Sequence, residues 1–119
     1  MRRTLSLVLG LAALALPAAA MADEPPAAFN ACKACHKVEA GKNAIGPSLF
    51  GVFGRKSGTA EGYGYSPALA AWGQVWGDDN LAKYLADPKG TVPGDKMAFA
   101  GLKKPEDIAA VIAYLKTLK

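Results

Sequence analysis

Two cysteines and a histidine lie close together near the start of the chain. They form the segment Cys32-Lys33-Ala34-Cys35-His36, and the 119-residue chain contains no further cysteine or histidine. Residues three and four positions apart share one face of a helix. The segment would therefore present two thiols and one imidazole on the same side of a helical turn, where they can bind a single partner.

Four kinds of site contain such a cluster. A structural zinc site needs four Cys or His ligands, and this chain has only three. A thioredoxin-like redox pair lies beside a βαβ pattern, which we do not find. A disulfide suits an oxidising compartment but does not require the histidine. Attachment of a c-type haem uses all three side chains, because the thiols add to the two vinyl groups and the imidazole reaches the iron. We therefore predict one covalently bound haem c.

Met97 is the candidate for a second iron ligand. Met1 and Met21 fall in an N-terminal segment that we expect to be removed, so Met97 is the one thioether of the mature chain. A lone methionine otherwise serves as a flexible filler of the core. Met97 instead lies in the turn-rich segment 92–99, and a loop can lay a ligand across the haem face opposite to His36. We predict that Met97 is that ligand.

Helical signals dominate the rest of the sequence, and we find no convincing alternation of the kind that strands show. Serine or aspartate caps and first-turn prolines mark the helix starts. The expected helices are one from Pro25 or Pro26 through Phe29 into the cysteine segment, one from Ser66-Pro67 to Ala71, one from Asp78-Asp79 to the residue before Pro88, and one that begins at Pro105. Residues 41–65 and 89–101 are rich in turn formers, so we expect loops there.

The first 22 residues have the pattern of a secretory signal peptide. The segment begins with the charged sequence MRR, continues with apolar residues 5–16 and ends in the cleavage motif AMA. A retained membrane anchor is the alternative, but the apolar run is at the short limit for a spanning helix. We expect cleavage after Ala22, export to the periplasm and a mature domain of residues 23–119.

The charge balance bounds the possible partners. The chain has 14 Lys or Arg and 10 Asp or Glu, a formal net charge of +4, and removal of Arg2 and Arg3 leaves 12 − 10 = +2. So small a surplus argues against nucleic acid, whose partners usually carry a strongly basic face. A domain of this size buries a limited share of its surface and often needs a cofactor to complete its core.

Beyond the cysteine segment, a series of motifs resembles the class I cytochromes c, specifically the short mitochondrial-type and cytochrome c2 branch. The matching segments run in order from about Phe29 to Lys116. They are CKACH at 32–36, GPSL at 46–49, GVFGR at 51–55, GYGYSPA at 62–68, Trp76, YLADP at 84–88, PGDKM at 93–97, FAGLKK at 99–104 and IAYLK at 112–116. The resemblance implies a class I cytochrome c fold, an all-α domain of four to five helices whose long loops wrap around one covalently attached haem.

The resemblance also implies roles for individual residues. Cys32 and Cys35 would form the haem thioethers, and His36 and Met97 would be the axial iron ligands. The Pro47 carbonyl would accept a hydrogen bond from the second ring nitrogen of His36. Further residues would line the haem pocket: the propionate donors Arg55, Tyr65 and Trp76, and Tyr84, whose hydroxyl would approach the methionine sulfur.

Six lysines resemble, in whole or in part, those that surround the exposed haem edge in this family: Lys37, Lys42, Lys89, Lys96, Lys103 and Lys104. Such a ring attracts acidic partners and speeds their encounter. The implied partners are membrane oxidoreductase complexes, or periplasmic dehydrogenases and oxidases, with acidic docking patches. The resemblance implies no catalytic residue, a monomer, and no stable membrane insertion after signal cleavage.

The implied function is transport of single electrons by a soluble periplasmic protein, as in a respiratory chain, without enzymatic activity. The alternative is a haem with a labile sixth ligand, which would reduce peroxide or bind small ligands. Asp95 keeps that alternative open, because many relatives carry threonine there and a carboxylate would lie close to the haem. The N-terminal segment also lacks the glycine that usually lets the two terminal helices cross closely, so the sequence does not predict how they pack.

Overall fold

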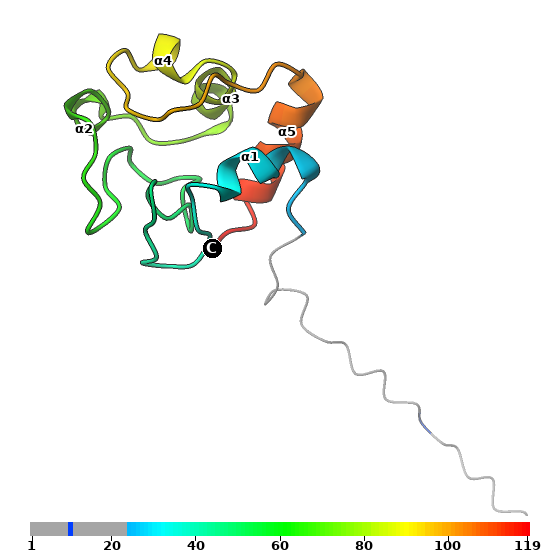
Figure 1. Cartoon of the computed structure of the whole chain (residues 1–119). Helices are drawn as coiled ribbons and strands as arrows, with labels where there is room; N and C mark the ends of the chain where they lie inside the picture. Colours follow the sequence, from blue (N-terminus) through cyan, green and yellow to red (C-terminus); the bar gives the residue numbers. More distant parts are fainter. Residues whose placement is uncertain (1–9, 11–23) are drawn as a thin grey trace, which may run out of the picture.

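The computed structural model describes Gly10 and residues 24–119, so the predicted signal peptide, residues 1–22, lies outside the described residues except for Gly10. The described part forms one turn of 3₁₀ helix and five α-helices, which Figure 1 shows in chain order. They are η2 (Ala27–Phe29), α1 (Asn30–Lys33), α2 (Pro67–Trp72), α3 (Asp78–Ala86), α4 (Pro88–Thr91) and α5 (Pro105–Leu115).

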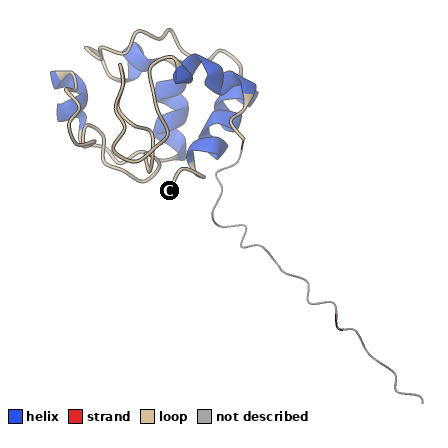
Figure 2. Cartoon of the chain, turned by 60° about the horizontal axis from the view of Figure 1, so that its bottom comes forward, coloured by secondary structure: helices blue, strands red, loops and turns tan. Residues whose placement is uncertain are grey.

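Long loops join these helices, and no strand forms among the described residues (Figure 2). The one extended pairing there is an isolated antiparallel bridge between Lys56 and Val75. The prediction of an all-α domain with four to five helices is therefore confirmed. No helix in residues 24–119 has both the length and the apolar content that a membrane crossing requires.

The helix starts follow the capping signals in the sequence. The N–H of Leu69 donates to the Ser66 hydroxyl at 3.1 Å, which caps α2, and Pro67 occupies the first turn. In α3, by contrast, the expected aspartate cap is wrong: Gly77 is the N-cap, its N–H donates to the Asn80 side chain at 2.7 Å, and Asp78 and Asp79 lie in the first turn. At the start of α5 two acidic residues follow Pro105, where the positive end of the helix dipole favours them.

One predicted loop contains a helix. We expected irregular chain from Lys89 onward, but residues Pro88–Thr91 form the single turn α4. The carboxylate of Asp87 accepts from the N–H of Gly90 at 3.0 Å, and Pro88 stands at the first helical position. Asp87-Pro88 therefore ends α3 and also caps the next helical turn. The sequence prediction treated Pro88 only as the end of α3 and so did not include α4.

The two ends of the described chain pack against each other. Phe29, at the end of η2, is 1% exposed, and its ring meets the ring of Tyr114 edge-on with centroids 4.8 Å apart. The contact is made by η2, which directly precedes α1 and packs against α5, orange to red in Figure 1. An edge-on aromatic pair holds the terminal helices together where the expected glycine is missing.

The loop that carries Met97 runs back along α3. The N–H of Leu102 donates to the carbonyl of Leu85 at 2.7 Å. Gly101 has a φ of +113°, and a Cβ on it would collide with the backbone of Ala86. Only glycine permits both this backbone conformation and this close approach. The loop is thereby fixed against α3 just after Met97.

Candidate cofactor site

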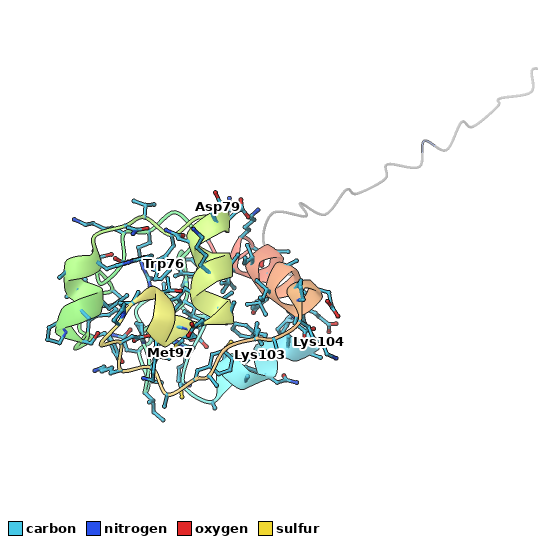
Figure 3. The ribbon with its side chains drawn as sticks, turned by 90° about the horizontal axis from the view of Figure 1, so that it is seen from above. Trp76, Asp79, Met97, Lys103 and Lys104 are labelled. Atoms are coloured by element: carbon cyan, nitrogen blue, oxygen red, sulfur yellow. The ribbon has the colours of Figure 1, made fainter. Side chains whose placement is uncertain are left out.

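A cavity of about 420 Å³ lies between the cysteine segment, the Met97 loop and helices α3 and α5. Its size is that of a site for a large organic ligand. All nine residues predicted to contact the cofactor line this one cavity: Cys32, Cys35, His36, Pro47, Arg55, Tyr65, Trp76, Tyr84 and Met97. In Figure 3 the labelled Trp76 and Met97 lie inside the ring of helices.

The two cysteines are half-buried free thiols. The N–H groups of Cys35 and His36 both donate to the carbonyl of Cys32, at 3.2 and 2.9 Å, so α1 continues into a turn that brings the three side chains to one side. Burial raises the pKa of the Cys32 thiol, and the neighbouring Cys35 raises it further. Redox-active CxxC motifs show the opposite shift, so Cys32 lacks the activation of a thioredoxin-like site.

The imidazole of His36 is held in one orientation. Its Nδ1 lies 2.7 Å from the carbonyl oxygen of Pro47, and because a carbonyl can only accept, Nδ1 carries the proton and Nε2 keeps its lone pair. Burial lowers the pKa of His36, which favours the neutral ring. A neutral imidazole with a free Nε2 is the form that ligates a metal.

Gly46 makes room for this ring. A Cβ at Gly46 would lie 2.7 Å from Nδ1 and 2.9 Å from Nε2 of His36, closer than real side-chain contacts allow. The Gly46 N–H also donates to the carbonyl of Cys35 at 2.8 Å. The backbone of residues 46–47 therefore backs one side of the imidazole.

Arg55 brings a positive charge to the cavity. Its two terminal nitrogens donate to the carbonyls of Phe50 and Ser48, each at 3.1 Å. Its Nε is buried and has no hydrogen-bond partner among the described residues. Buried polar groups are normally satisfied, so an anionic group in the cavity would complete this side chain.

Tyr65 and Trp76 add further polar groups at the cavity wall. The Tyr65 hydroxyl accepts from the N–H of Ala60 at 2.9 Å, which leaves its own proton available. Trp76 is 6% exposed and packs against Tyr84 with ring centroids 4.9 Å apart. Together with Arg55, these residues fit the carboxylate end of a haem.

Tyr84 and Met97 also line the cavity, and Asp95 contacts both of them. The Tyr84 hydroxyl donates to Oδ2 of Asp95 at 2.6 Å and lies 3.9 Å from the sulfur of Met97. Burial and the Asp95 carboxylate raise the pKa of Tyr84 above its usual range, so this hydroxyl stays protonated. Asp95 lies behind Tyr84 and Met97, outside the cavity lining.

The six predicted docking lysines are all exposed. Only Lys96 lines the cavity; its ammonium group donates to the carbonyl of Gly64 and lies 4.8 Å from the centroid of the Tyr63 ring. Lys89 donates to the carbonyl of Asp95 at 3.1 Å. Lys103 donates to the carbonyl of Ala100 at 3.1 Å, and Lys104 lies beside the start of α5, toward the edge of the molecule in Figure 3.

Sequence reasoning assigned no role to Tyr63, which also lines the cavity. Its hydroxyl donates to the carbonyl of Ile45 at 2.9 Å, and its ring meets that of Tyr65 edge-on with centroids 4.8 Å apart. The alternation Gly-Tyr-Gly-Tyr at 62–65 was the available signal, because tyrosines two apart lie on one side of an extended segment.

These residues fit a haem better than a directly bound metal ion. Within residues 24–119 no three His, Cys, Asp or Glu side chains gather as metal ligands. The cavity instead combines two thiols, one oriented imidazole, a thioether and mainly apolar walls. A second, open hollow of about 670 Å³ at the start of α3 is lined by polar and charged residues, and none of the predicted site residues reaches it.

Comparison with known proteins agrees with this geometry. The family model described as cytochrome c matches residues 24–119. The chain is 64% identical over 97 residues to cytochrome c2 iso-2 of Magnetospirillum fulvum, which covers 82% of this chain and all of the relative. It is 60% identical over 98 residues to cytochrome c2 of Rhodoplanes tepidamans, with coverages of 82% and 100%.

A solved structure shows the same fold. Cytochrome cH from Methylobacterium extorquens superposes with a TM-score of 0.72 at 50% sequence identity, over 76% of this chain and 91% of that one. The chain therefore belongs to the cytochrome c family, in its cytochrome c2 branch, and its cofactor is covalently bound haem c.

Proposed function

We propose that this chain is a periplasmic carrier of single electrons whose iron is held by His36 and Met97. Members of the cytochrome c2 branch are electron carriers rather than enzymes, and this chain is therefore an electron carrier. Ligation by His36 and Met97 is supported by one observation: an oriented imidazole and the one thioether of the mature chain line the same cavity.

The bound haem supplies the one-electron exchange between ferrous and ferric iron. The protein contributes attachment, orientation and exclusion of water. Cys32 and Cys35 would hold the haem through thioethers, and the Pro47 carbonyl fixes the tautomer of His36, which leaves Nε2 free to bind the iron. Met97 would supply the second protein ligand to the iron. A methionine ligand opposite a histidine raises the reduction potential.

The haem carboxylates would accept hydrogen bonds from Arg55, Tyr65 and Trp76. A buried carboxylate is costly unless charged or polar donors meet it. The unsatisfied Nε of Arg55 and the available Tyr65 proton support this assignment. Tyr84 would keep its hydroxyl close to the methionine sulfur on the other side.

Export and docking complete the proposal. The family model begins at residue 24, which agrees with a domain that starts after cleavage at Ala22; N-terminal sequencing of the exported protein tests this. The exposed lysines Lys37, Lys42, Lys89, Lys96, Lys103 and Lys104 would attract oxidoreductases with acidic docking patches. The protein would act as a monomer.

The ligand assignment is tested by replacing Met97. Oxidised, haem-loaded protein should show the weak near-infrared band of a sulfur–iron bond, and Met97→Ala should lose this band and bind cyanide without delay. His36 and both thioether bonds remain in that variant, so haem should stay attached. If the parent protein lacks the band and binds cyanide at once, the sixth position is open, and the ligand-binding or peroxidase alternative replaces this proposal.

A further inference from the structure

We propose that Asp95 is a positioning residue for Met97: its buried carboxylate bridges the Tyr84 hydroxyl and the Met97 backbone, and thereby sets how firmly the sulfur is held on the iron. This inference rests on the proposed ligation by Met97. It concerns this chain in particular, because the family resemblance implies threonine at this position in many members, whereas this chain has Asp95.

Asp95 has a hydrogen-bond partner for each of its polar groups. Oδ2 accepts from the Tyr84 hydroxyl at 2.6 Å, and Oδ1 accepts from the N–H of Met97 at 3.0 Å. Its own N–H donates to the carbonyl of Val92 at 3.0 Å, and its carbonyl accepts from Lys89 at 3.1 Å. The residue is 6% exposed. A buried carboxylate is stable only when its oxygens accept hydrogen bonds in this way.

The two oxygens act on different parts of the methionine. Oδ1 fixes the backbone of Met97, which limits where its side chain can begin. Oδ2 fixes the Tyr84 hydroxyl, which lies 3.9 Å from the sulfur. The hydroxyl has one proton and gives it to the carboxylate at 2.6 Å, so its oxygen, rather than its proton, is left to meet the sulfur.

A single-oxygen side chain cannot make this bridge in the same way. A threonine hydroxyl would have to serve both donors with one atom, whereas the carboxylate offers a separate oxygen to each. Hydrogen bonds to a charged acceptor are also about twice as strong as neutral ones. The carboxylate therefore holds the Met97 loop more firmly, and its negative charge stabilises ferric over ferrous iron.

The test uses the haem-loaded protein, with imidazole as a competitor for the sixth position. Asp95→Asn keeps the shape but loses the charge and one acceptor, so we expect ferric protein to bind imidazole about tenfold more tightly, as the loss of a charged hydrogen bond implies. Its reduction potential should rise and its near-infrared sulfur–iron band should shift or weaken. Asp79→Asn is the matched control: Asp79 is exposed at the start of α3, far from Met97 in Figure 3, and should leave all three readings unchanged.

A second variant separates the bridge from the charge alone. Tyr84→Phe keeps the carboxylate and its bond to Met97, so imidazole affinity should rise less than in Asp95→Asn. In the double variant the two effects should not add, because both break the same bond. If Asp95→Asn does not fold with haem, Asp95→Thr replaces it, with a change in the same direction.

The outcomes also distinguish this inference from the proposed function. If the parent protein has the sulfur–iron band but Asp95→Asn matches Asp79→Asn in imidazole affinity and potential, Asp95 does not position Met97, while ligation by Met97 stands. Additive effects of Tyr84→Phe and Asp95→Asn overturn the bridge. If the parent lacks the band, ligation by Met97 and this inference are both wrong.

Discussion

Gly46 shows how one missing side chain controls the orientation of His36, the proposed iron ligand. The His36 ring lies where a Cβ of residue 46 would be, and the next residue supplies the carbonyl that fixes the ring tautomer. A substitution here would push the imidazole away from Pro47.

We therefore expect Gly46→Ala to lower the free energy of unfolding of the haem-loaded protein by about 1–3 kcal/mol, the usual cost of overpacking. Guanidinium titration measures this change. Gly64→Ala is the control, because a Cβ at Gly64 meets nothing within 4 Å. Equal stability of the two variants would show that His36 moves aside without cost.

The sequence predicted which residues line the cavity, but it did not predict all of the contacts between them. Cys32, Cys35 and His36 are neighbours in sequence, so their spacing alone predicts a common partner. The bond between Tyr84 and Asp95 joins residues eleven positions apart on a helix and a loop. Its existence depends on how that loop folds back over α3, which residue types do not specify.

The helices illustrate which signals a sequence carries. The starts of α2 and α5 were predicted correctly, because Ser66 caps α2 and Pro105 stands at the first position of α5. At Asp87-Pro88 two boundaries coincide, so the turn α4 was missed. A helix of this length forms through its cap and its contacts with α3 rather than through its own propensity.

The cap of α4 should therefore matter more than its length suggests. Asp87→Ala removes the acceptor for the Gly90 N–H and should reduce the free energy of unfolding by about 1 kcal/mol. Asp87→Asn should retain most of the stability, because an amide oxygen caps equally well. Thermal unfolding of the two haem-loaded variants checks this, and equal losses would mean that charge rather than capping is responsible.

For the whole molecule, the distribution of charge matters more than its sum. The mature domain is expected to carry only +2, yet six exposed lysines are proposed for docking. A weak net charge with a localised positive face orients an approaching acidic partner. The encounter should then depend on where lysines are lost.

This is tested with two double variants of equal net charge. Lys37→Glu with Lys104→Glu should slow electron transfer to an anionic small-molecule oxidant several-fold at low ionic strength, and the difference should fade with salt. Lys56→Glu with Lys83→Glu changes exposed lysines outside the proposed set. Equal rates in the two double variants would show that only net charge is sensed.

The contact between Phe29 and Tyr114 has a consequence for the order of assembly. Phe29 lines the cavity together with Val111 and Leu115 of α5, so one wall is built from both ends of residues 24–119. The cysteines emerge early during synthesis, whereas α5 emerges last. Haem can therefore be joined to an open chain, and the arrival of the final helix then closes the site around it.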